Sequence, residues 1–209
     1  MDTNDVLIFD FDGTIADTLH FLIEIINRLS KEFDFKTIAA HEITELKDKS
    51  VGEVIQHLNI PLLKVPIIAA KARIELHKEI KSVQPAEGLK DMLQQLKSLG
   101  VKMGILTSNS LKNVMEFLKH NELDLFDFVH TTPKIWGKNR SLKTLMQENQ
   151  LDLLQVIYVG DETRDIIAAQ KAGIRSVAVT WGYNSTKALQ AHNPDYVIHN
   201  PQELLQILK

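Results

Sequence analysis

Two acidic residues near the start of the chain, Asp10 and Asp12, are separated by a single phenylalanine. They follow the apolar run Val6–Phe9 and precede Gly13 and Thr14. Such a run is typical of a buried strand, and open α/β sheets bind ligands at the carboxyl ends of strands. Strand alternation directs both carboxylates to one side, where their repulsion requires a cation, a shared proton or a buried partner. A strand that runs into an acidic turn is the alternative interpretation.

Polar side chains also gather at three later points of the chain. They are Thr107, Ser108 and Asn109 after a second apolar run, Lys138 before a helix, and Asp161, Glu162 and Asp165 after another strand. Parallel strands would bring these groups to one edge of a sheet. Carboxylates with a lysine and a hydroxyl suit a phosphoryl group beside Mg²⁺, which takes oxygen ligands. Singly, Thr107 could be a strand-end hydroxyl, Lys138 a surface lysine and Asp161 a helix cap; their joint order favours a site.

The elements that must position these residues alternate in type from residue 84 onward. Strands are expected at Val101–Thr107, Phe126–His130, Val156–Val159, Val177–Thr180 and Tyr196–Ile198. Helical spacing of apolar residues lies between them, with Gly100 and Gly173 as stop signals. Alternation with short connections predicts the α/β class, as a doubly wound parallel sheet covered on both faces.

A long insertion separates the first strand from the rest of the expected sheet. Apolar residues recur at helical spacing from Leu19 to Phe33, and no convincing strand pattern occurs between Asp17 and Val83. Pro61 and Pro66 suit the start of a further helix. We therefore predict an α/β core of residues 1–15 and 84–209 and a small all-helical domain of residues 16–83.

Composition narrows the possible functions. The 209 residues carry a net charge of −3 and show no basic stripe, which argues against a nucleic-acid partner. Absence of cysteine excludes disulfides, thiolate catalysis and thiolate metal sites. The acidic start does not resemble a signal peptide, and no apolar run is long enough to span a bilayer. We expect a cytoplasmic protein without a membrane partner, and leave its oligomeric state open.

The chain resembles the haloacid dehalogenase-like hydrolase superfamily along essentially its whole length. The motifs that carry the resemblance are Asp10-Phe11-Asp12-Gly13-Thr14, Thr107, Lys138, and Gly160-Asp161-Glu162-Thr163-Arg164-Asp165. The helical insertion is similar to the type 1 cap of the phosphoglycolate phosphatase and β-phosphoglucomutase branch. The resemblance implies a Rossmann-like core and a Mg²⁺-dependent phosphatase acting on a small phosphorylated metabolite, such as a phosphoglycolate-like molecule or a sugar phosphate.

The resemblance also implies roles for the first motif. Asp10 would attack phosphorus and form an aspartyl-phosphate. Asp12 would protonate the leaving oxygen and then assist the water that attacks the intermediate. Both residues would contact the metal, Asp12 through its main-chain carbonyl.

The remaining motifs would hold the phosphoryl group and the metal. Thr107 and Lys138 would bind phosphoryl oxygens. Asp161 would be a direct metal ligand, and Asp165 would hydrogen-bond to a metal-bound water or to Lys138. No organic cofactor is implied, because phosphoryl transfer needs chiefly positioning and charge stabilisation.

Several positions depart from the usual family pattern, so the substrate is left open. Asn139 follows Lys138 where relatives often have proline, and Glu162 stands where serine is frequent. The segment around Lys47 and Lys49 resembles the substrate-specificity loop of the cap, which makes these lysines candidates for binding an anionic substrate. Solvated surface lysines are the alternative.

Three other functions remain open from the motifs. A phosphosugar mutase would return the phosphoryl group to a sugar, and a phosphonate hydrolase would use a cap lysine as a Schiff base. A non-catalytic binding or regulatory module could also keep this fold.

Overall fold

The computed structural model describes residues 5–132 and 137–208. Within them, six strands form a single parallel sheet in the order β3-β2-β1-β4-β5-β6. The strands are β1 (Val6–Phe9), β2 (Lys102–Thr107), β3 (Phe128–Thr131), β4 (Val156–Gly160), β5 (Arg175–Val179) and β6 (Tyr196–Ile198). Order and direction confirm the predicted doubly wound parallel sheet, with β1 between β2 and β4 at its centre.

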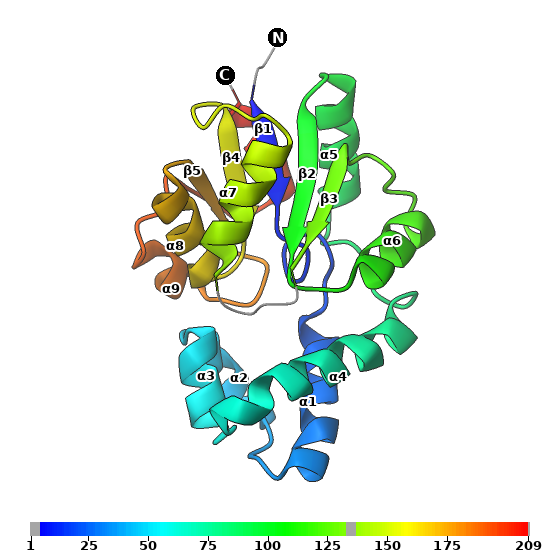
Figure 1. Cartoon of the computed structure of the whole chain (residues 1–209), viewed down its shortest axis with the longest axis vertical. Coiled ribbons are helices and arrows are strands. Elements are labelled where there is room, and N and C mark those ends of the chain that lie inside the picture. The colour runs from blue at the N-terminus through cyan, green and yellow to red at the C-terminus, as the bar shows by residue number, and fades with distance from the viewer. Residues whose placement is uncertain (1–4, 133–136, 209) are drawn as a thin grey trace.

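Helices cover both faces of this sheet (Figure 1). One face carries α5 (Leu89–Ser98), α6 (Leu111–His120) and the 3₁₀ segment η3 (Pro201–Gln206); the other carries α7 (Lys138–Glu148), α8 (Thr163–Ala172) and α9 (Thr186–Gln190). Alternation along β1 divides the core, because Leu7 and Phe9 pack on the first face while Val6 and Ile8 pack on the second. The sheet is therefore apolar on both sides, and its polar groups lie at the strand ends.

A helical cap lies beyond the carboxyl ends of the strands (Figure 1). It contains α1 (Leu19–Phe33), η1 (Ala40–Glu42), α2 (Ile43–Leu46), α3 (Val51–His57), η2 (Leu62–Lys64) and α4 (Val65–Glu79). Helices α1 and α4 pack together, with Ile25, Leu29, Ile68 and Leu76 in one apolar cluster that continues into the core. The predicted boundaries of the cap, at residues 16 and 83, stay a prediction.

Two neighbouring segments of the chain connect the cap to the core. The Asp17 N–H donates to the carbonyl of Gln84 at 3.0 Å, and the Ala86 N–H donates to that of Ile15 at 3.0 Å. These bonds fasten the exit from β1 to the return segment before α5. No helix among the described residues has both the length and the apolar composition needed to cross a membrane.

Candidate active site

The first predicted acid, Asp10, lies directly after the central strand and is almost completely buried. Its main-chain N–H donates to the carbonyl of Val159 at 2.8 Å, which continues the pairing of β1 with β4. Its carboxylate accepts from the Phe11 N–H at 2.8 Å through Oδ1 and from Lys138 Nζ at 2.6 Å through Oδ2. Neighbouring strands and these two donors hold the carboxylate in place.

Lys138 joins two carboxylates from distant parts of the chain. It begins α7, directly after Gly137 with its left-handed φ of 91°, and is buried. Its Nζ lies 2.6 Å from Asp10 Oδ2 and 2.5 Å from Asp165 Oδ1. Burial alone would lower the pKa of Lys138, but the charges of Asp10 and Asp165 outweigh burial and raise that pKa well above its ordinary value. The ammonium group therefore stays charged.

The second acid, Asp12, is held by Asn109 from the loop after β2. Asn109 Nδ2 donates to both carboxylate oxygens, at 3.0 and 3.1 Å. Asn109 Oδ1 in turn accepts from the Ser110 N–H at 2.7 Å and from Asn113 Nδ2 at 2.9 Å, so the amide group faces Asp12 with its donors. Burial, and then the charge of Asp10, raise the pKa of Asp12 to about 7. This carboxyl can exchange a proton at neutral pH.

Thr107 ends β2 on the same edge of the sheet. It is fully buried, and its hydroxyl oxygen accepts from the Asn109 N–H at 3.0 Å. Asn109 therefore contacts Asp12 through its side chain and Thr107 through its main-chain N–H. Because β1 and β2 are adjacent and parallel, the Thr107 hydroxyl and the two acids share one end of the sheet.

Asp161 follows β4 and is enclosed by protein. Its Oδ1 accepts from the Thr14 hydroxyl at 2.7 Å and its Oδ2 from the Tyr183 N–H at 2.7 Å. A Cβ on Gly13, whose φ is 77°, would lie 2.2 Å from Asp161 Oδ2, so only glycine fits there. Burial, and then the neighbouring acids Glu162 and Asp165, raise the pKa of Asp161 well above its ordinary value.

The start of α8 contributes Glu162 and Asp165. The Glu162 N–H donates to Asp165 Oδ2 at 3.0 Å, and Arg164 Nε donates to Glu162 Oε2 at 2.6 Å. Carboxylate oxygens of Asp10, Glu162 and Asp165 lie within 4.8 Å of one another, and all three residues are buried. Burial, together with Asp10 and Glu162, raises the pKa of Asp165 to about 6 despite the opposing charge of Lys138.

This carboxylate cluster fits a divalent cation. Burial first, and then repulsion between neighbouring acids, raise the pKa values of Asp161 and Asp165, and a bound cation would offset both effects. Carboxylate oxygens are also the ligands that Mg²⁺ prefers. The structure brings Asp10, Lys138 and Asp165 together through hydrogen bonds, places Asp12 close enough for the charge of Asp10 to act on it, and places Thr107 on the same edge. Asp161 is adjacent through Glu162, but it is not among the acids grouped within 4.8 Å.

Sequence reasoning gave no role to four residues that shape this site. Asn109 and Glu162 were named among the polar groups at the strand ends, but neither received a role of its own. Tyr183 and Asn184 follow β5 without any motif. The Tyr183 hydroxyl lies 2.7 Å from Thr18 Oγ1, and Asn184 Oδ1 accepts from the Thr163 N–H at 2.9 Å. Only the fold brings this loop to the first and fourth motifs.

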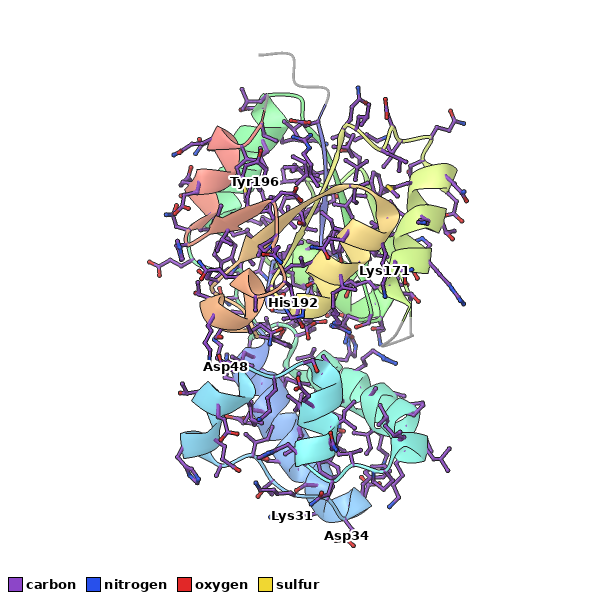
Figure 2. The ribbon with its side chains drawn as sticks, turned by 90° about the vertical axis from the view of Figure 1, so that its left-hand side faces the viewer. Lys31, Asp34, Asp48, Lys171, His192 and Tyr196 are labelled. Carbon is purple, nitrogen blue, oxygen red and sulfur yellow. The ribbon has the colours of Figure 1, made fainter. Side chains whose placement is uncertain are left out.

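The loop of the two candidate cap lysines is fastened to the core. Asn184 Nδ2 donates to the carbonyls of Lys47 and Lys49, both at 2.9 Å, and the Ser185 N–H donates to that of Lys47 at 2.8 Å. Figure 2 shows Asp48 at the edge of the cap that faces the core, and its carboxylate accepts from the Ser185 hydroxyl. Lys47, Lys49 and Asp12 line a common cavity of about 300 Å³. The loop therefore borders the acids of the core.

Comparison with known proteins agrees with this geometry. The family model described as haloacid dehalogenase-like hydrolase matches residues 7–179. A phosphoglycolate phosphatase from Synechococcus elongatus is 34% identical over 201 residues, which cover 96% of this chain and 95% of that protein. A pyrophosphatase, PpaX, from Bacillus mycoides is 27% identical over 100% of this chain and 98% of its own.

Solved structures share the fold. A haloacid dehalogenase-like family hydrolase from Streptococcus pneumoniae superposes with a TM-score of 0.81 at 24% identity, over 97% of each chain. A predicted phosphatase from Clostridium acetobutylicum gives a TM-score of 0.83 at 21% identity, also over 97% of each chain. Both likenesses extend over the core and the cap.

Proposed function

This chain belongs to the haloacid dehalogenase-like hydrolase family and is a phosphatase, and from that premise we propose that it hydrolyses a small phosphorylated metabolite through an aspartyl-phosphate on Asp10. One observation carries the proposal. Lys138 Nζ bonds both Asp10 and Asp165, so a cation and three neighbouring carboxylates surround the point where the central strand ends. Such a site can hold a phosphoryl group against a carboxylate nucleophile.

The first half of the reaction transfers the phosphoryl group to Asp10. An oxygen of the Asp10 carboxylate forms a bond to phosphorus as the ester P–O bond breaks. Asp12 gives its proton to the leaving oxygen, a role suited to a carboxyl whose pKa is about 7. Asn109 orients Asp12 for this transfer through its two hydrogen bonds.

The second half releases inorganic phosphate. Asp12, now ionised, takes a proton from a water molecule whose oxygen attacks phosphorus, and the bond to Asp10 breaks. Lys138 and the Thr107 hydroxyl hold phosphoryl oxygens in both halves and stabilise their charge. The cap covers the site and limits the entry of bulk water.

Mg²⁺ would be held by Asp10, the main-chain carbonyl of Asp12 and Asp161, with Asp165 acting through water or Lys138. Glu162 adds a further carboxylate beside Asp10 and Asp165. When bound, the ion supplies positive charge to the phosphoryl oxygens. The buried carboxylates in this region outnumber the positive charges of Lys138 and Arg164, which supports a bound cation. They are Asp10, Asp161, Glu162 and Asp165.

Phosphate release from a panel of esters tests the proposal. We would include 2-phosphoglycolate and pyrophosphate, which the names of the relatives suggest, and hexose phosphates. Asp10→Asn should lower kcat by roughly 10³-fold or more on every accepted ester, because it removes the nucleophile. Asp17→Asn, an exposed acid seven residues along the chain, is the matched control and should retain full activity.

Undiminished turnover by Asp10→Asn would refute the assigned nucleophile. A hexose phosphate converted to its isomer without free phosphate would instead identify a phosphosugar mutase. Lack of any turnover across the panel with Mg²⁺ present would count against an enzyme.

A further inference from the structure

The cavity beside the acids extends deep into the cap. It measures about 300 Å³, and residues of all four cap helices, α1 to α4, line it. Figure 1 shows these helices beyond the strand ends. Asp12, Asn109 and Arg164 line the same cavity, so it is continuous with the site of phosphoryl transfer.

Polar and apolar lining residues occupy different parts of this cavity. Among the described residues that line it, the aliphatic ones all come from cap residues 19–76. The polar ones belong to the core, or to cap segments whose main chain is bonded to the core. The main-chain carbonyls of Lys47 and Lys49 accept from Asn184 Nδ2. The Arg73 carbonyl accepts from Asn113 Nδ2 at 3.0 Å. The cavity is therefore charged at its mouth and aliphatic in its interior.

Aliphatic side chains of the cap border this cavity. Leu22 and Ile26 from α1 and Val54 from α3 line the cavity and are only partly buried. Leu22 and Ile26 also pack against the buried apolar cluster that includes residues of α4, so only part of each side chain borders the hollow. Apolar atoms that border a hollow lose the contacts that close packing would give them. A ligand that fills the hollow would restore those contacts.

The position of Asp12 sets which part of a substrate enters the cavity. The phosphoryl group lies against Asp10 and Lys138, and the leaving oxygen must lie near Asp12 to receive its proton. Asp12 borders the mouth, so the carbon atoms beyond that oxygen extend toward the aliphatic interior. Aliphatic walls offer no partner for the hydroxyl groups of a sugar, which would be buried without hydrogen bonds.

We propose that the substrate is a phosphate monoester of an alcohol that carries an apolar chain, and that this chain fills the cavity inside the cap. The inference rests on the proposed function, since it concerns the leaving group of that reaction. Polar sites at the mouth, including Lys47 and Arg73, would serve the phosphate and any polar group next to it. A two-carbon substrate such as phosphoglycolate would occupy the mouth and leave the interior empty.

A series of n-alkyl phosphates tests this proposal in the unmodified protein with Mg²⁺. From methyl through butyl to hexyl phosphate, kcat/KM should rise by up to about fourfold for each methylene that enters the cavity, equivalent to about 0.8 kcal/mol. The rise should level off once the cavity is full. Equal kcat/KM for methyl and hexyl phosphate would overturn the proposal while leaving the phosphatase function intact.

Variants locate the effect. Leu22→Gln should lower the ratio of kcat/KM for hexyl to methyl phosphate by tenfold or more, because it places a polar group in the interior. Leu63→Gln is the same change at a cap leucine that is 92% exposed, and should leave the ratio unaltered. Val54→Trp, which narrows the cavity, is a second variant if Leu22→Gln does not fold. An unchanged ratio in the folded cavity variant would place chain recognition elsewhere and overturn the proposal.

Binding separates failure of the inference from failure of the proposed function. If no ester is hydrolysed, titration calorimetry with methylphosphonate and hexylphosphonate still tests the cavity. Tighter binding of hexylphosphonate that is lost in Leu22→Gln supports it. Equal affinity for the two phosphonates overturns it.

Discussion

The edge of the sheet and the interior of the cap are both enclosed, yet they are built in opposite ways. At the edge, buried charges contact one another closely, as Lys138 does with Asp10 and Asp165. In the cap, aliphatic side chains such as Leu22 and Val54 border a cavity. The first arrangement holds charged groups in place through short contacts, whereas the second leaves room for another molecule. Under the proposals above, the core carries out the reaction and the cap selects the substrate.

Replacing Asp12, the proposed proton donor, should produce the largest effect that separates these two roles. Asp12→Asn should lower kcat on alkyl phosphates by about 10²- to 10⁴-fold, because the leaving oxygen no longer receives a proton. The factor should be the same for methyl and hexyl phosphate if the cap takes no part in proton transfer. Steady-state kinetics on both esters measures it, and a factor that depends on chain length would contradict the division.

The same variant gives a second signature. With p-nitrophenyl phosphate the leaving group needs no proton, so Asp10 should still be phosphorylated. We expect a burst of nitrophenolate that approaches one equivalent of enzyme, followed by slow turnover. If Asp12→Asn releases nitrophenolate slowly from the start, without a burst, Asp12 is not the base for hydrolysis of the aspartyl-phosphate alone.

Removal of metal should affect the core edge next most strongly. Burial, with neighbouring acids, raises the folded pKa of Asp165 to about 6 and that of Asp12 to about 7, from 3.8. Between pH 3.8 and these raised pKa values, the folded chain binds more protons than the unfolded chain. The free energy of unfolding therefore falls as pH rises through this range. With EDTA, the free energy of unfolding should drop by on the order of 2 kcal/mol between about pH 5 and pH 7.5.

Urea unfolding at the two pH values measures this drop, and Mg²⁺ should reduce it by binding the folded state. Asp165→Asn should lose part of the pH dependence. A metal-free chain that becomes more stable over this range would contradict the account of the carboxylate cluster.

Loosening the contact between cap and core should have a moderate effect. Asn184→Ala removes the donors to the carbonyls of Lys47 and Lys49. Each such bond contributes about 1 kcal/mol, so we expect kcat/KM to fall about tenfold, chiefly through KM. Ser185→Ala removes the hydroxyl contact to Asp48 but keeps the N–H bond to Lys47, and its loss should be smaller. A fall in kcat at constant KM would place Asn184 in the reaction itself.

The smallest effect is expected within the cap, away from its cavity. Glu42 contacts Lys36, and its Oε1 lies 3.1 Å from His57 Nε2. The hydrogen bond from Lys36, with those from Ala39 and His57, lowers the pKa of Glu42 to about 2. The stabilisation is present above the ordinary pKa of 4.5 and is lost as pH falls through about 2.

Glu42→Gln should therefore lower Tm at neutral pH by at most a few °C, because its partner Lys36 is exposed to solvent that screens the ion pair. Scanning calorimetry measures the change, and kcat/KM should not alter. A large loss of activity would show that the cap surface acts on the site.

Prediction from sequence succeeded where apolar runs and polar strand ends coincide. The strand predicted at Val101–Thr107 is one residue longer than β2, which begins at Lys102, and Gly173 ends α8 with a left-handed φ of 76°. Strand β5 begins at Arg175, two residues before the predicted apolar run. The apolar pattern missed the first two residues of β5 because they are polar. Ser176 can be buried there because its hydroxyl donates to Asp195 Oδ2 at 2.8 Å.

The rest of the site depends on distances that no local pattern contains. Parallel strand ends predicted that Asp10, Lys138 and Asp165 would converge, but not that Glu162 would join Asp10 and Asp165 within 4.8 Å. The loop of Tyr183 and Asn184 reaches the acids only through the position of β5. Apolar spacing in the cap predicted helices, yet helical spacing alone does not tell a packed interior from a hollow one.

Trapping the covalent intermediate tests the central claim most directly. The enzyme would be mixed with an accepted ester and Mg²⁺, quenched during turnover, reduced with borohydride and digested for mass spectrometry. An aspartyl-phosphate is reduced to homoserine, and we predict this change at residue 10 and only when the ester is present. Unmodified Asp10 during turnover, or reduction at another carboxylate, would contradict the account.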